Sequence, residues 1–178
     1  MRTAVASRRS SPKVSAGAPT RSELLPLVEA AGNVADHGAL RPWRLIELRE
    51  DARALLGAAI AEASGKHGRD AEKLAAKPLR ADLLIAVVAS RKPSHKVHAW
   101  EQDAAAAGVA HNLGLLLTEA GWGVMWRTGP FTRSEPVREL HRLGENEALL
   151  GWLYVGTPAE ATTDRKPPID AERFITRL

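Results

Sequence analysis

A short and almost uninterrupted apolar run, Ala81–Ala89 with the sequence ADLLIAVVA, most constrains the fold of this chain. Its length suits one strand, and the lack of apolar–polar alternation is typical of a strand with both faces buried. A sheet that contains such a strand must be covered on both of its faces by other elements. The run therefore predicts a central strand inside a layered domain.

Helical and strand patterns follow one another along the rest of the chain. Thr20 and Glu23 form a capping box before an apolar helical face, which ends at Gly32. Further helices are predicted at about 52–64, 66–77, 96–120 and 134–143, and further strands at 43–48, 121–127 and 148–155. This order predicts one domain over residues 1–178, with about four strands in a mixed sheet flanked by helices, in an α+β or α/β three-layer arrangement.

The longest uncharged stretch, residues 104–118, is too short to span a bilayer, so no membrane association is predicted. It is too apolar on all sides for a helix with a solvent face, so we interpret it as a core helix that reaches a dimer interface. The tail, residues 159–178, is polar but ends near an apolar pair, Phe174 and Ile175. Such an ending predicts docking on another subunit.

Composition excludes several classes of protein. The chain has no Cys, which excludes a disulfide framework, a thiolate nucleophile and an iron–sulfur cluster, and which fits a cytoplasmic protein. The arginines at the N-terminus are not followed by an apolar run, so no secretory signal is predicted. The net charge is +4, but the basic residues are interspersed with acidic ones, and Tyr and Phe together number three. A base-stacking platform is therefore not expected, whereas a binder of small anions would be equally basic.

Three clusters together indicate a site for a planar, phosphorylated ligand. Arg8-Arg9-Ser10 offers two guanidiniums, which bind phosphate bidentately, and a hydroxyl. Trp126-Arg127-Thr128-Gly129 closes a predicted strand with an indole, a guanidinium and a hydroxyl. Asp36-His37 precedes Arg41-Pro42-Trp43 in a predicted loop. Each cluster also has an ordinary interpretation: the first as a basic tail, the second as a half-buried strand end and the third as a surface His. The combination of all three predicts a flavin mononucleotide (FMN) site.

Other chemistry finds little support in the sequence. No dinucleotide-binding Gly-x-Gly-x-x-Gly follows a strand, and neither a P-loop nor a Gly-x-Ser-x-Gly elbow is present. His95, His98 and Glu101 could share a helix face, but no matching cluster occurs elsewhere, so no metal site is predicted. No catalytic side chain is singled out, because a flavin would carry the redox chemistry itself.

Five segments, in this order, resemble the nitroreductase family, and especially its short bacterial NAD(P)H nitroreductases. They are Arg8-Arg9-Ser10, the DHGALRPW segment at 36–43, HKVHAWEQ at 95–102, GWGVMWRTG at 121–129 and LYVGTP at 153–158. The resemblance runs from Arg8 to Pro158 and so covers most of the chain.

The resemblance implies an intertwined homodimer with two FMN molecules at the subunit interface and NAD(P)H as the electron donor. The site residues that it implies are Arg8, Arg9, Ser10, Trp126, Arg127 and Thr128 from one subunit and Asn33 and His37 from the other. The expected activity is reduction of electron-poor small molecules such as nitroaromatics or quinones. A non-catalytic flavin-binding or storage protein on the same fold is the alternative, and a nucleic-acid-associated protein is a third, more distant one.

Three positions depart from the family's pattern. The family often has Arg or Ser at the position of Asn33, and it has Asn or Gln at the position of Arg41. An amide both donates and accepts hydrogen bonds, whereas Arg only donates. Lys13 stands where the family usually has Arg, which keeps the charge but not the planar fork. Weaker FMN binding is an expected consequence.

Overall fold

The computed structural model describes residues 2–159 and 169–178. The helices and 3₁₀ turns are α1 (Arg2–Ser7), α2 (Arg21–Ala31), η1 (His37–Ala39), α3 (Asp51–Ala63), α4 (Gly68–Ala75), η2 (Pro78–Arg80), α5 (Ala99–Glu119), η3 (Pro130–Arg133), α6 (Glu135–Leu140) and η4 (Ala171–Phe174). The strands are β1 (Val14–Ser15), β2 (Trp43–Leu48), β3 (Leu83–Ser90), β4 (Gly123–Arg127) and β5 (Glu147–Pro158). The predicted α+β class is confirmed, and each predicted helix and strand is present with small shifts at its ends.

The sheet is built around the long strand β5. Its described strands lie in the order β1-β5-β3-β2, and β4 also pairs with β5. All four ladders are antiparallel, so the prediction of a mixed sheet is wrong for the described residues. The reason is visible between β2 and β3: α3 and α4 pack on each other and return the chain to the end of the sheet that it left, where Leu48 faces Leu84. The prediction of about four strands also missed the two-residue strand β1.

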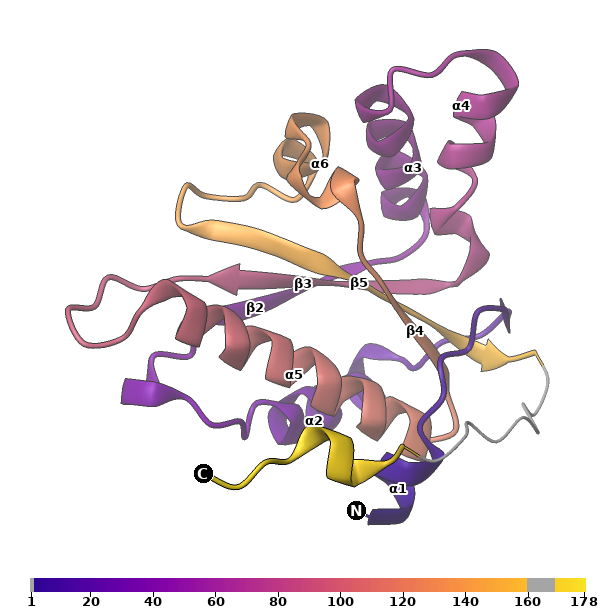
Figure 1. Cartoon of the computed structure of the whole chain (residues 1–178). Helices are drawn as coiled ribbons and strands as arrows, with labels where there is room; N and C mark the ends of the chain where they lie inside the picture. The colour runs from indigo at the N-terminus through magenta and orange to yellow at the C-terminus, as the bar shows by residue number, and fades with distance from the viewer. Residues whose placement is uncertain (1, 160–168) are drawn as a thin grey trace.

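Helices cover both faces of the sheet, as the central apolar run predicted. Helices α2 and α5 lie on one face, and α3, α4 and α6 lie on the other (Figure 1). Every residue of β3 is buried. Its Leu84, Ala86 and Val88 join the core beneath α3 and α6. Leu83, Ile85 and Val87 join the core beneath α2 and α5. A continuous apolar run is therefore what a strand between two helical layers requires.

Strand β5 contains an irregularity that shapes its surroundings. The register against β3 shifts between Val87 and Val88, which face Gly151 and Leu149, so Leu150 is the extra residue of a bulge. Gly151 has φ +140°, and a Cβ there would lie 2.4 Å from the carbonyl oxygen of Arg127 and 2.8 Å from the indole nitrogen of Trp126. Only glycine lets β4 approach β5 this closely.

Helix α2 begins where its sequence signal predicts, and α5 combines a buried side with an exposed one. Thr20 caps α2 through its side chain, and the Glu23 carboxylate accepts a hydrogen bond from the Thr20 backbone N–H at 2.7 Å, which confirms the capping box. Helix α5 is buried along one side only, through residues such as Val109 and Leu113. Its other side leaves Ala104 and His111 exposed, so within one chain α5 is a core helix on one side, and the dimer interface predicted for it stays a prediction.

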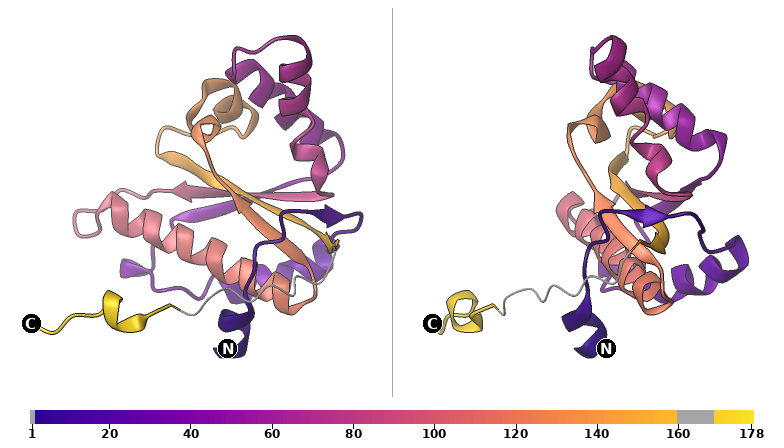
Figure 2. Two further views of the ribbon diagram at one scale, coloured as in Figure 1. Left: turned by 45° about the vertical axis from the view of Figure 1, so that its right-hand side comes forward. Right: turned by 90° about the vertical axis from the view of Figure 1, so that its right-hand side faces the viewer.

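The C-terminal segment stands apart from the folded body (Figure 2). Ile169, Phe174, Ile175 and Leu178 are all exposed. The predicted tail, 159–178, lies partly outside the described residues, which omit 160–168. A search of the described helices finds none that is both long and apolar enough to cross a membrane.

Candidate flavin site

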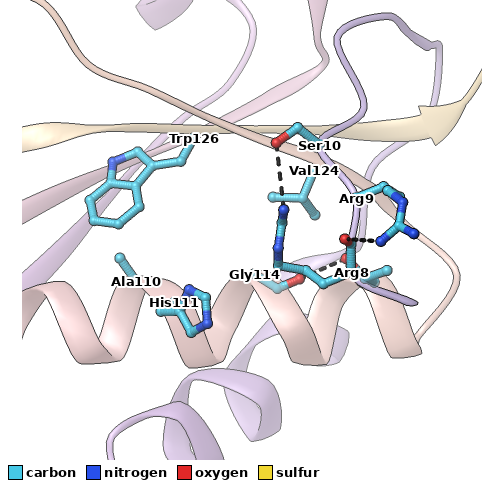
Figure 3. A pocket seen from close by; sticks show the side chains of 9 residues that line it. Arg8, Arg9, Ser10, Ala110, His111, Gly114, Val124 and Trp126 are labelled. Atoms are coloured by element: carbon cyan, nitrogen blue, oxygen red, sulfur yellow. Dashed lines mark hydrogen bonds between the residues drawn. The ribbon is translucent and has the colours of Figure 1, made fainter. Parts of the chain in front are cut away.

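The first predicted cluster lines a cavity on the outer side of α5. This Arg8 cavity has a volume of about 300 Å³ and contains Arg8, Arg9 and Ser10 together with Trp126 of β4. Helix α5 supplies the remaining polar lining through His111 and Thr118 and an open backbone position at Gly114. Figure 3 shows the arginines and the indole on opposite sides of the space above the helix.

The two arginines are held by their own segment. Arg9 Nη1 donates hydrogen bonds to the carbonyl oxygens of Arg8 at 2.8 Å and Ala6 at 3.1 Å. Arg8 Nη1 lies 3.5 Å from the Ser10 hydroxyl oxygen (Figure 3). Both arginines are half-buried. Ser11 N–H donates to the Val124 carbonyl oxygen at 2.9 Å, which fixes the whole segment against β4. The segment is therefore anchored beside the sheet and is not the basic tail of the alternative interpretation.

Of the third predicted cluster, His37 lines a separate cavity beside the first half of α5, whereas Asp36, Arg41, Pro42 and Trp43 do not line it. This His37 cavity, of about 580 Å³, contains Asn33 and His37 on one side and Trp100, Gly108 and Asn112 of α5 on the other. Both cavities open on the same helix, one beside its first half and the other beside its second half. Within one chain the structure thus does not bring Asn33 and His37 together with Arg8, Arg9 and Ser10.

A carboxylate ties the His37 loop to the start of α5. Glu101 Oε2 lies 2.9 Å from His37 Nδ1, and Glu101 Oε1 accepts a hydrogen bond from the His98 backbone N–H at 3.0 Å. The hydrogen bond with His37, followed by that from His98, lowers the pKa of Glu101 below its usual value. Glu101 therefore caps α5 and positions His37. Among the described residues, no cluster of three or more His, Cys, Asp or Glu side chains could hold a metal ion.

Two of the positions that depart from the family's pattern, Asn33 and Arg41, have well-defined hydrogen bonds or backbone conformations. Asn33 Nδ2 donates to the carbonyl oxygens of Glu29 at 3.2 Å and Ala30 at 3.3 Å, at the end of α2. The Arg41 side chain is exposed, and its backbone has the left-handed φ of 47°. Asp36 Oδ2 accepts a hydrogen bond from the Arg41 N–H at 2.7 Å and so holds this conformation.

The second predicted cluster is divided between the two faces of the sheet. Trp126 packs on the core beneath α5 and lines the Arg8 cavity. The guanidinium of Arg127 lies over the Tyr154 ring, 5.1 Å from its centroid, and Tyr154 belongs to the core of the opposite face. Arg127 and Thr128 line a third cavity there, which Trp126 also touches. Because successive strand residues point to opposite faces, adjacency in sequence separated these side chains.

Sequence reasoning missed the contribution of α5. His111, Gly114 and Thr118 line the Arg8 cavity, while Gly108 and Asn112 line the His37 cavity. A signal was present, because His111 and Asn112 are the polar residues that interrupt the uncharged stretch. Polar side chains in such a stretch indicate a side of the helix that does not face the core.

Comparison with known proteins identifies the family and the fold of the chain. The model of the "Nitroreductase family" matches residues 5–157. The protein named "Putative NAD(P)H nitroreductase YdjA" from Escherichia coli strain K12 is 32% identical over 173 residues, which cover 95% of this chain and 94% of that protein. Among solved structures, a nitroreductase-like family protein from Bacillus cereus has a TM-score of 0.86 at 20% identity, covering 99% of this chain and 95% of that one. A mutant of the FMN and NADPH-dependent nitroreductase NfnB from Sphigopyxis sp. strain HMH has a TM-score of 0.78 at 17% identity, covering 99% and 97% of the two chains.

Proposed function

Because the chain belongs to the nitroreductase family, whose members are oxidoreductases, we propose that it binds FMN and transfers electrons from NAD(P)H to small electron-poor molecules such as nitroaromatics or quinones. The observation that carries the proposal is the Arg8 cavity. It places Arg8, Arg9 and Ser10 opposite Trp126 on the family's fold. The NfnB neighbour is itself named as FMN- and NADPH-dependent.

The donor set of the Arg8 cavity fits FMN. Two permanently charged guanidiniums suit a phosphate, and the Ser10 and Thr118 hydroxyls suit polar groups of the flavin's side chain. The indole of Trp126 offers a flat apolar surface. When bound, FMN would supply the redox chemistry, accepting a hydride from NAD(P)H and passing electrons to the substrate. The protein's residues would hold it, orient it and shield it from water.

We propose that the complete site is shared between two copies of the chain. A homodimer usually has a two-fold axis, which presents the same patch of each copy to the other. If the axis crosses α5 near His111, the first half of one helix lies beside the second half of its partner. The His37 cavity, lined by Gly108, then meets the partner's Arg8 cavity, lined by Gly114. Asn33 and His37 would complete the site from the second subunit.

The role proposed for Thr128 and Arg127 is less direct. Thr128 follows the end of β4 and is exposed, but it lines the third cavity and not the Arg8 cavity, so contact with FMN would require it to turn from its present position. The guanidinium of Arg127 lies on the opposite face, so contact with FMN would require it to turn away from Tyr154.

The absorption spectrum of the purified protein tests the proposal. We expect flavin bands that bleach on addition of NAD(P)H and return when a nitroaromatic or quinone is added. Flavin bands that do not bleach would favour the storage alternative. A colourless protein that takes up no added FMN would contradict the proposal, and salt-dependent binding to nucleic acid would then favour the third interpretation.

A further inference from the structure

The third cavity, on the face of the sheet opposite the Arg8 cavity, has the character of a ligand pocket. This Tyr154 cavity is lined by Ile60 of α3 and by residues of the strands β4 and β5, on the face of the sheet that α3 and α4 cover. Its volume of about 460 Å³ is within the range of small-molecule sites. Trp152 and Tyr154 of β5 and Phe131 of η3 give it an aromatic lining.

The charge of the Tyr154 cavity is one-sided. Lys77, Arg80 and Arg127 line it, and its lining includes no Asp or Glu. Within the described part of the chain, none of the three cations forms a salt bridge. Three unpaired cations around an apolar recess produce a positive potential that attracts an anion.

Two residues that line this cavity, Arg127 and Trp126, each have a buried nitrogen without a partner among the described residues. Arg127 Nε is buried without a hydrogen-bond partner among the described residues, although its Nη2 donates to the Pro12 carbonyl oxygen at 3.3 Å. The indole nitrogen of Trp126, which lines both this cavity and the Arg8 cavity, is also buried and has no hydrogen-bond partner in the described part of the chain. Burial raises the pKa of Tyr154, although the charges of Arg127 and Arg80 act in the opposite direction. The Tyr154 hydroxyl therefore stays protonated and can donate a hydrogen bond to an acceptor.

We propose that the Tyr154 cavity binds a small aromatic carboxylate. The aromatic lining suits a planar apolar body, and the guanidiniums of Arg80 and Arg127 suit a carboxylate. The Tyr154 hydroxyl would donate the additional hydrogen bond. The pocket is distinct from the Arg8 cavity, because Arg8, Arg9 and Ser10 line that cavity on the opposite face and only Trp126 lines both. In this proposal Arg127 keeps its observed position over Tyr154 and does not turn towards FMN.

Calorimetric titration of the flavin-loaded protein with 2-naphthoate tests this proposal, with neutral 2-naphthamide as the matched ligand. We expect one 2-naphthoate per chain and at least tenfold weaker binding of the amide. Arg80→Met removes an exposed charge and should weaken 2-naphthoate binding about tenfold, as expected for a lost charged hydrogen bond. Tyr154→Phe should weaken it about three- to tenfold. Lys66→Met, which removes an exposed charge away from the cavity, should leave it unchanged.

Three outcomes of the titrations with wild type, Arg80→Met and Tyr154→Phe would overturn the proposal, and a fourth comes from Arg9→Ala. The three are no binding of 2-naphthoate, equal affinity for the acid and the amide, and unchanged affinity in both Arg80→Met and Tyr154→Phe. The experiment separates this site from the flavin site through Arg9→Ala, which should leave 2-naphthoate binding intact. Loss of binding only in Arg9→Ala would assign the acid to the flavin site and refute the Tyr154 cavity as its location.

Discussion

Arg44 and Glu147 bridge two strands that are not neighbours. Arg44 lies on β2 and Glu147 at the start of β5, with β3 between them. The Nε and Nη2 atoms of Arg44 each lie 2.7 Å from a different carboxylate oxygen of Glu147, and the Gly144 N–H donates to the same carboxylate at 3.1 Å. The hydrogen bonds from Arg44 are the main cause of a pKa of about 2 for Glu147.

Replacement of Glu147 should reveal this interaction as a loss of stability that depends on pH. A lowered pKa in the folded state stabilises the protein above the unfolded pKa of about 4.5, and that contribution is lost as the pH falls towards 2. Glu147→Gln should lower the free energy of unfolding by about 1–3 kcal/mol at pH 7, and the difference from wild type should shrink below pH 4. Urea unfolding of both proteins at pH 7 and below pH 4 measures this difference in the free energy of unfolding. Glu145→Gln, at an exposed position two residues away, should have little effect at either pH.

His141 should make stability depend on pH in a higher range. Its Nδ1 lies 2.7 Å from the Val137 carbonyl oxygen, and its Nε2 accepts a hydrogen bond from the Trp152 indole at 3.1 Å. Burial is the main cause that lowers its pKa below 6.5. The neutral form is therefore favoured on folding, and its contribution is complete above pH 6.5 and lost as the pH falls below it. The melting temperature should drop as the pH falls below 6.5, and His141→Gln should flatten this part of the profile.

A matched exposed histidine provides the control for that experiment. His67→Gln, in the loop before α4, should leave the pH profile of the wild type unchanged. A profile with the same slope in wild type and His141→Gln would show that the buried imidazole does not govern stability in this range.

The shared flavin site predicts complementation between two defective chains. Arg9→Ala and His37→Ala should each weaken FMN binding, by about 10- to 150-fold for the charged contact of Arg9. In a mixed dimer, one site contains both substitutions and the other contains neither. Random mixing after unfolding and refolding should therefore restore roughly a quarter of the FMN sites. Flavin absorbance of the repurified mixture gives the measurement.

The complementation also tests assembly. A site contained within one chain would show no recovery on mixing, since every chain would still carry one substitution. Mixing Arg9→Ala with Arg8→Ala is the matched control, because both changes affect the same half-site, and it should recover nothing. A stable monomer at micromolar concentration, measured by light scattering, would contradict both the dimer and the shared site.

Arg41 should be replaceable by the amide that the family's pattern contains. Its backbone is left-handed, a conformation in which Asn is several-fold enriched over most residues, and its side chain is exposed. Arg41→Asn should therefore raise the free energy of unfolding by about 0.5–1 kcal/mol. Lys96→Asn removes an equivalent exposed charge without this backbone benefit and should not stabilise the protein. An unchanged or lower stability in Arg41→Asn would show that the guanidinium has contacts that outweigh the backbone term.

The sequence by itself determined the elements and their local signals. Thr20 and Glu23 fixed the start of α2 because a capping box involves neighbouring groups alone. The run Ala81–Ala89 predicted a strand between two helical layers because an unbroken apolar run needs cover on both faces. The resemblance then named residues of the candidate site, because each of the family's motifs is a short contiguous segment that can be matched along the sequence.

The tertiary structure alone decided how distant residues meet. The direction of the strands could not be predicted, because a helical connection can lead to a parallel or to an antiparallel strand. Here α3 and α4 return the chain to the end of the sheet that it left, so β3 runs antiparallel to β2. The pair of His37 and Glu101 joins residues 64 positions apart, which no local pattern encodes. Trp126 and Arg127 are adjacent in sequence, yet the alternation of a strand sends one towards the proposed flavin site and the other to the opposite face.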